Sequence, residues 1–217
     1  MDLQVDGARV HVATGGRAFD PNRPAIIFLH GAGCDHTTWM LPARWFAHHG
    51  FSVLVPDLAG HGRSEGKALA TIAEWSLWTE RLMRVAQVPH AALVGHSMGG
   101  AIAIETAARL KDRVTHVGLI GTAAAIPVGP ALLEAAKTAP EQAYDMMTAW
   151  GHGPRGRLGG SPVPGLWMSG GTRAIFNQCH AGALASDLAA CSIWDTGKSA
   201  AGSIACSAAV ITGSHDV

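Results

Sequence analysis

Short apolar runs alternate with longer amphipathic stretches through the first half of the chain, and this alternation constrains the fold most. The expected strands are short runs rich in apolar β-formers; they cover residues 8–13, 25–30, 52–56, 91–95 and 114–121. The expected helices show helical spacing of apolar residues; they cover residues 39–49, 71–86 and 98–110. Strands that alternate with helices in this way form a mostly parallel sheet with helices on both faces. The predicted fold class is α/β.

This alternation stops after Thr122. The later segments are a helical pattern, a stretch dense in Gly, Pro and Ser, a second helical pattern and a strand pattern; they cover residues 131–150, 151–171, 172–190 and 207–212. We interpret residues 1–217 as one domain with a helical cap inserted at about 122–200. The alternative is a loose connector that packs on the core.

The composition excludes several classes of protein. With 48% hydrophobic residues and 16 basic against 16 acidic residues, the chain is suited neither to disorder nor to binding nucleic acid. Apolar stretches such as residues 205–211 are far shorter than the roughly 20 residues of a membrane span. Residues 1–6 carry acids where a signal peptide has basic residues. We expect a cytoplasmic protein with no nucleic-acid or membrane partner, and the oligomeric state stays open.

The cysteines and histidines form no recognisable metal-binding pattern. The four cysteines are too widely spaced for a CxxC pair; they are Cys34, Cys179, Cys191 and Cys206. No HExxH motif occurs among the 12 histidines. We therefore expect buried free thiols, no metal and no cofactor.

The sequence Gly95-His96-Ser97-Met98-Gly99 contains the pattern G-x-S-x-G, directly after an expected strand and directly before an expected helix. A serine at such a tight turn is held with its hydroxyl exposed, and the flanking glycines give the turn room. The start of the helix also favours an anionic intermediate, because its amides are unpaired and its dipole is positive there. This pattern makes Ser97 the candidate nucleophile.

A second glycine-rich turn, His30-Gly31-Ala32-Gly33, follows an earlier expected strand. Acyl transfer needs backbone N–H donors directed at the developing oxyanion. The usual pair is the amide of the residue after the nucleophile and one from a loop after an earlier strand. The expected donors are therefore the amides of Met98 and Ala32.

The third feature is the segment 210–216, an apolar strand followed by a short loop that ends in Asp216. A catalytic triad needs an acid that orients the histidine and stabilises the imidazolium. Asp216 follows both the candidate nucleophile and a strand, which is the chain order of such acids in hydrolases.

Together these residues resemble the α/β-hydrolase superfamily, in its single-domain branch of esterases and lipases. The matching motifs follow the family's order along nearly the whole chain; they are His30-Gly31, Pro56-Asp57 with Gly60-His61-Gly62-Arg63-Ser64, Gly95 to Gly99, and Gly213 to Asp216. The resemblance implies hydrolysis of a small apolar ester or related acyl compound without a cofactor. It assigns Ser97 as nucleophile, Asp216 as acid and the amides of Ala32 and Met98 as oxyanion hole.

One departure concerns the general base. The triad needs a histidine downstream of the acid, and only Val217 follows Asp216. The other candidates for the general base are His30, His61, His96 and His215. The position of each in the sequence disfavours it in that role. We expect a truncated hydrolase of very low activity, because loss of one triad member leaves only roughly 10³–10⁴-fold catalysis over water.

Two alternatives remain. A non-catalytic protein of the same fold would bind a small molecule under its cap. A dinucleotide-binding oxidoreductase would use Gly31 and Gly33 after a strand, with Asp57 as the acid that grips the ribose. Against the second alternative, His36 replaces the third glycine of that fingerprint, and Ser97 would have no role.

Overall fold

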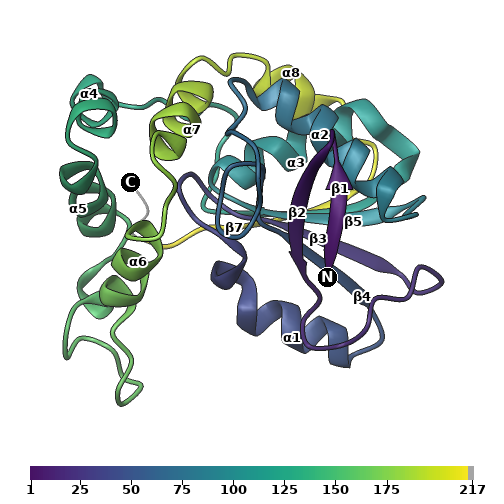
Figure 1. Cartoon of the computed structure of the whole chain (residues 1–217), viewed down its shortest axis with the longest axis horizontal. Coiled ribbons are helices and arrows are strands. Elements are labelled where there is room, and N and C mark those ends of the chain that lie inside the picture. Colours follow the sequence, from purple (N-terminus) through teal and green to yellow (C-terminus); the bar gives the residue numbers. More distant parts are fainter. Residues whose placement is uncertain (215–217) are drawn as a thin grey trace.

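The computed structural model describes residues 1–214, which form a seven-stranded sheet in the order β1-β2-β4-β3-β5-β6-β7 (Figure 1). The strands are β1 Asp2–Val5, β2 Ala8–Ala13, β3 Ala25–Leu29, β4 Ser52–Pro56, β5 Ala91–His96, β6 Val114–Ile120 and β7 Ser207–Ile211. Strand β2 pairs antiparallel with β1 and with β4, and the pairs from β4 to β7 are parallel. The predicted α/β class is confirmed; β1 is an addition that the sequence did not indicate.

The central strands β3 and β4 are buried throughout and mostly apolar, because both faces of the sheet are covered. Ile26 and Phe28 pack with Trp39 on the face covered by helix α1 (Met40–His48). Ile27 and Leu29 belong to the larger core on the opposite face, with residues of α2 (Ile72–Val85) and α3 (Met98–Leu110). Figure 1 shows α1 on one side of the sheet and α2 and α3 on the other.

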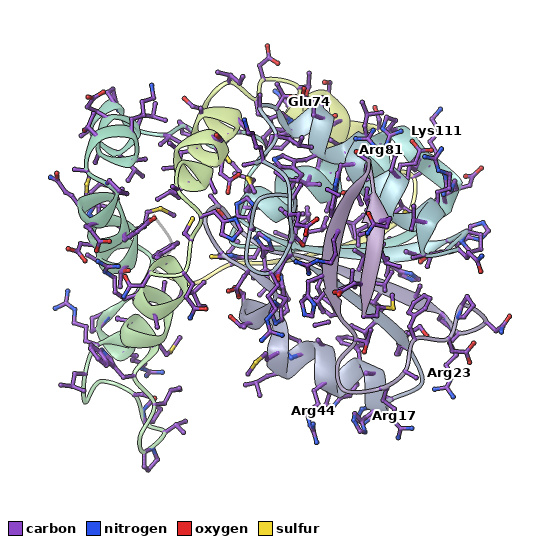
Figure 2. All side chains as sticks on the ribbon, viewed as in Figure 1. Arg17, Arg23, Arg44, Glu74, Arg81 and Lys111 are labelled. Atoms are coloured by element: carbon purple, nitrogen blue, oxygen red, sulfur yellow. The ribbon has the colours of Figure 1, made fainter. Side chains whose placement is uncertain are left out.

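Helix α2 illustrates how the sequence sets an element's position. Its N-terminus has a capping box, in which the Thr71 hydroxyl accepts a bond from the Glu74 amide and the Glu74 carboxylate accepts one from the Thr71 amide. Trp75 and Trp78 lie on its buried face. Charged side chains such as Glu74 and Arg81 lie on the exterior of the molecule (Figure 2). This amphipathic pattern fixes α2 against the sheet.

The segment between β6 and β7, which we call the insert, is helical. Its helices are α4 Pro130–Thr138, α5 Pro140–Trp150, α6 Met168–Phe176, α7 Ala183–Ser192 and α8 Gly197–Gly202. The pattern at 131–150 is split into α4 and α5 because Pro140 cannot continue a helix and the residue before it, Ala139, is not helical (φ −146°, ψ 67°). Short 3₁₀ turns occur at His36–Trp39, Lys111–Arg113 and Pro154–Gly156. Within residues 1–214 no helix combines the length and the apolar character needed to cross a membrane.

The helices of the insert divide between two places. Helix α8 packs on α3 above the sheet, whereas α4, α5 and α6 stand together beside it (Figure 1). Helix α7 contacts both α4 and α3, so it lies between the two groups. The insert therefore covers one end of the sheet.

Strand β7 forms one edge of the sheet, and all five of its residues are exposed. The strand has the sequence Ser-Ala-Ala-Val-Ile, without a charged residue, and Val210 is 66% exposed. An uncharged apolar edge strand offers unpaired N–H and C=O groups to other chains.

We expect Val210→Lys to reduce self-association of this chain, because a charge on an edge strand opposes edge-to-edge pairing. Sedimentation velocity across a concentration series measures the effect. The matched control is Leu158→Lys, which changes an exposed residue of the insert, away from the sheet edge. Equal self-association of the wild type and Val210→Lys would contradict the expectation.

Candidate active site at the carboxyl edge of the sheet

A cleft of about 630 Å³ lies at the carboxyl ends of the parallel strands. One wall comes from the loops after the strands and includes Gly31, Ala32, His96 and Ser97. The opposite wall comes from the insert; its lining residues include Met147, Trp150, His152, Thr172, Ile175 and Phe176. Parallel α/β sheets place their ligand sites at this edge.

Ser97 occupies the turn between β5 and α3 in a left-handed conformation, with φ 52° and ψ −120°. Non-glycine residues rarely adopt such a positive φ, and the surrounding structure must hold them there. The Ser97 amide donates to Ile120 O at 3.0 Å, and the Ser97 carbonyl accepts from Gly100 N at 2.8 Å and from Thr122 Oγ1 at 2.9 Å. These bonds hold the half-buried serine at the cleft.

The glycines on either side of Ser97 are required because backbones meet there. A Cβ at Gly95 would lie 2.1 Å from Gly99 O, and one at Gly99 would lie 2.1 Å from Leu29 O. Neither contact can be relieved by moving a flexible side chain. The predicted strand, tight turn and helix around Ser97 are therefore present, and the two glycines have the expected steric role.

The loop after β3 lies directly beside Ser97. A Cβ at Gly31 would lie 3.0 Å from His96 Nδ1 and 3.4 Å from Ser97 Cβ. Ala32 follows in this loop, and Met98 is the first residue of α3, where an amide has no carbonyl partner within its helix. The fold therefore brings together the predicted nucleophile and the loop of the predicted Ala32 donor.

His30 is fully buried, and both of its ring nitrogens are engaged. Its Nδ1–H donates to Gly31 O at 2.9 Å, and its Nε2 accepts from Leu58 N at 3.0 Å. Burial, assisted by the nearby His61, lowers the pKa of His30 to about 4. Gly31 O and Ala32 N belong to the same peptide group, so neutral His30 fixes the plane of the predicted oxyanion donor.

The other described histidines near the cleft have different partners. His61 Nε2 donates to Asp187 Oδ2 at 2.8 Å, and its Nδ1 lies 3.1 Å from Ala59 O. Burial alone would lower the pKa of His61, but the Asp187 carboxylate outweighs it and raises the pKa above the usual value. The ring of His96 lies against Gly31 and lines the cleft.

His152 is a cleft residue that the sequence did not indicate. It lies in the insert, where its Nδ1 donates to Thr148 O at 3.1 Å and its Nε2 lies 3.1 Å from Thr172 Oγ1. Nothing in its local sequence pattern indicates the cleft, because the path of the insert decides which of its residues reach it.

Cys34 also lines the cleft, and it carries a thiol rather than a thiolate. Burial raises the pKa of Cys34 to about 12, so the reactive anion is scarce near neutral pH. Cys34 therefore does not compete with Ser97 as a nucleophile.

Asp216 and His215 lie outside the described residues. The loop that leads to them from β7 reaches the cleft, since Gly213 and Ser214 line it. The predicted acid thus follows directly on residues that border Ser97's cleft.

Asp57 is buried and holds the loop around it together. Its Oδ1 accepts from both the amide and Nδ1 of His36 at 2.7 Å, and its Oδ2 accepts from Arg63 N at 2.8 Å. Within residues 1–214, His11, His36 and Asp57 form a grouping whose atoms lie within 4.8 Å, as a metal site would need. In this arrangement Asp57 fixes the loops that contain His36 and Arg63.

Replacing Ser97 by glycine should stabilise the fold while it removes the hydroxyl, because glycine adopts φ 52° without strain. We expect Ser97→Gly to exceed Ser97→Ala by about 1 kcal/mol in free energy of unfolding. Urea melts of the two variants measure the difference. Equal stabilities would show that the turn stores no strain.

His30 should make the fold sensitive to mild acid. Its pKa is about 4 when folded, against 6.5 for an ordinary histidine, so only the unfolded chain takes up this proton between pH 6.5 and 4. Stability from His30 is complete above pH 6.5 and is lost as pH falls through this range, in total on the order of 3 kcal/mol.

Unfolding free energies of the wild type and His30→Gln, measured across this range, test the expectation. The wild type should lose stability more steeply than the variant, which lacks this titration. Parallel curves would mean that His30 is not held neutral.

Comparisons of this chain with known protein families and structures agree with this geometry. A family model described as serine aminopeptidase, S33, matches residues 20–154, more than half of the chain. The crystal structure of the enol-lactonase from Burkholderia xenovorans LB400 is 26% identical, with a TM-score of 0.80, and the match covers 99% of this chain and 82% of that one. A thermophilic esterase structure is 27% identical, with a TM-score of 0.68, over 90% of this chain and 68% of that one.

Curated relatives match over shorter segments. The dihydrolipoyllysine-residue acetyltransferase component of the acetoin cleaving system from Cupriavidus necator is 34% identical over 126 residues. That match covers 58% of this chain and 31% of that protein, so the chain spans about a third of its curated relative. The expected resemblance to the α/β-hydrolase superfamily is confirmed, and the chain belongs to the α/β-hydrolase family described as serine aminopeptidase, S33.

Proposed function

We propose that this chain carries the nucleophile and the oxyanion hole of a serine hydrolase for a small apolar ester or related acyl compound. One observation carries the proposal: Ser97 stands in a strained left-handed turn at a cleft that Ala32 also lines. Strain of this kind persists where the surrounding fold enforces it, commonly at functional sites. The similar enol-lactonase and esterase structures support ester chemistry in particular.

In the proposed reaction, Ser97 Oγ attacks the substrate carbonyl and loses its proton to a base. The carbonyl oxygen becomes an oxyanion, which the amides of Ala32 and Met98 hold. The intermediate collapses to an acyl-serine and expels the alcohol, which takes up the proton. Water then attacks the acyl group, releases the acid and returns the proton to Ser97.

The base of the proposed reaction is a histidine, which Asp216 is assigned to orient. Among the described histidines, His30, His61 and His152 already use both ring nitrogens in contacts of their own. We therefore assign the role of base to none of these three. Reaction of Ser97 with a strong electrophile tests the nucleophile and the oxyanion hole without identifying the base.

The walls of the cleft favour an apolar acyl or alcohol group. Met147, Ile175 and Phe176 contribute apolar surface from the insert, and His152 and Thr172 add a fixed polar pair. Sites of this kind bind small molecules by apolar burial and use a few polar groups to orient them. We propose a small-molecule substrate that fits between the insert and the sheet.

A fluorophosphonate probe should label the wild type at Ser97, because this electrophile needs a nucleophile and an oxyanion hole but no turnover. Labelling should be lost in Ser97→Ala and retained in Cys34→Ser, whose side chain lines the same cleft. Any hydrolysis of p-nitrophenyl acetate should also fall in Ser97→Ala, because the acyl-serine then cannot form. Mass spectrometry locates the adduct.

Two results would overturn the proposal. An unlabelled wild type that binds small apolar molecules would favour the non-catalytic alternative. Labelling that persists in Ser97→Ala would place the reactive group elsewhere.

A further inference from the structure

Asp187, on helix α7 of the insert, connects the insert to the loops beside Ser97. Its side chain is fully buried, and its Oδ2 accepts two hydrogen bonds. One comes from Gly33 N at 2.9 Å and the other from His61 Nε2 at 2.8 Å. These donors lie 154 and 126 residues away along the chain, so one carboxylate oxygen ties the insert to two loops at the carboxyl edge of the sheet.

The bond to Gly33 bears directly on the amide of Ala32. His30 holds the peptide group that contains this amide, through Gly31 O. Asp187 holds the next peptide group, through Gly33 N. With the peptide planes on both sides of Ala32 fixed, the residue has little freedom to rotate, and its N–H keeps one direction.

Helix α7 also packs directly against this loop. Gly33 has a positive φ of 66°, and a Cβ there would lie 3.0 Å from Leu184 Cδ1. Leu184 and Asp187 are three residues apart, so they share one face of α7. That face therefore contacts Gly33 through packing and through a hydrogen bond at once.

Burying the Asp187 carboxylate costs free energy, and a contact that only packed α7 against the loop would not require a charged group. Asp187 Oδ1 is buried and has no hydrogen-bond partner within residues 1–214. A negative charge beside the oxyanion loop would also oppose the negative charge of the intermediate. His61 compensates this charge, because both of its ring nitrogens face oxygen acceptors, Asp187 Oδ2 and Ala59 O, and a ring that donates to both carries a positive charge. A buried polar atom without a partner is uncommon in native proteins and calls for an explanation.

We propose that Asp187 is a positioning residue for acyl transfer: it fixes the oxyanion amide of Ala32 through the Gly33 N–H, with its charge compensated by His61. This inference rests on the proposed function and deepens it. It means that the insert, which forms one wall of the cleft, also sets the direction of the oxyanion donor on the other wall.

The first test measures how fast a fluorophosphonate inactivates Ser97, with the limiting rate constant and the half-saturating concentration determined separately. Removing one oxyanion donor costs roughly 10²–10³-fold in rate, so misdirecting one should cost at least about tenfold. We expect Asp187→Leu, similar in size but unable to accept a bond, to lower the limiting rate about tenfold or more. The half-saturating concentration should change little.

Asp187→Asn provides the conservative comparison. Its amide oxygen can still accept from Gly33, but the charge that holds the His61 proton is lost. The limiting rate should therefore fall about threefold, between the wild type and Asp187→Leu. The matched controls are Asp195→Asn and Asp195→Leu, at an exposed aspartate shortly after α7, and they should leave the rate unchanged.

The second test does not depend on the reaction. Amide hydrogen exchange at Gly33, followed by NMR, should accelerate in Asp187→Asn and more strongly in Asp187→Leu. The ¹⁵N shifts of the His61 ring should show both nitrogens protonated at neutral pH in the wild type and only one in Asp187→Asn. This spectroscopic signature would not follow from a general loss of packing.

The outcomes separate the two claims. If Asp187→Leu retains the wild-type limiting rate, or the wild-type exchange at Gly33, the positioning role is wrong. Where Asp187→Leu fails to fold, a wild-type limiting rate in Asp187→Asn refutes that role. A wild type that is never labelled at Ser97 refutes the proposed function and with it the role in acyl transfer. Fast labelling of the wild type with unchanged rates in both Asp187 variants refutes the positioning role alone.

Discussion

The close approach of backbones around Ser97 is the constraint on which the rest of the site depends. Gly95 meets the first turn of α3, and Gly99 meets the end of β3, at separations that admit no side chain. Helix α3 therefore begins in direct contact with the central strands, and Ser97 is forced into a left-handed turn. The same contact brings the loop after β3 beside Ser97, so the positions of the proposed nucleophile and its neighbouring amides are consequences of one packing arrangement.

Buried polar groups then fix the loops that this packing brings together. Neutral His30 joins the loop after β3 to Leu58, and Asp57 fixes the loop that contains Arg63. Asp187 adds the third anchor, from the insert. Each anchor satisfies backbone amides that no strand or helix can satisfy, which is how irregular loops reach a rigid geometry.

Much of the fold could be predicted, because the signals are local. The apolar runs of β3 and β4 and the capping box of α2 depend on neighbouring residues only. The elements of the insert are less predictable from the sequence, because its helices are short and are interrupted by Pro140 and by a Gly- and Pro-rich segment. The course of the insert over the sheet depends on packing between residues far apart in the sequence, and the local spacing of apolar residues does not indicate it.

The sequence by itself determined the α/β class, the turn at Ser97 and the glycines around it, because a short motif in a regular strand and helix admits few geometries. Only the tertiary structure decided that His152 and Cys34 line the cleft, and that Asp187 reaches Gly33 and His61. The physical reason is separation along the chain. Contacts between residues more than a hundred positions apart are set by how whole elements pack, and no local pattern encodes them.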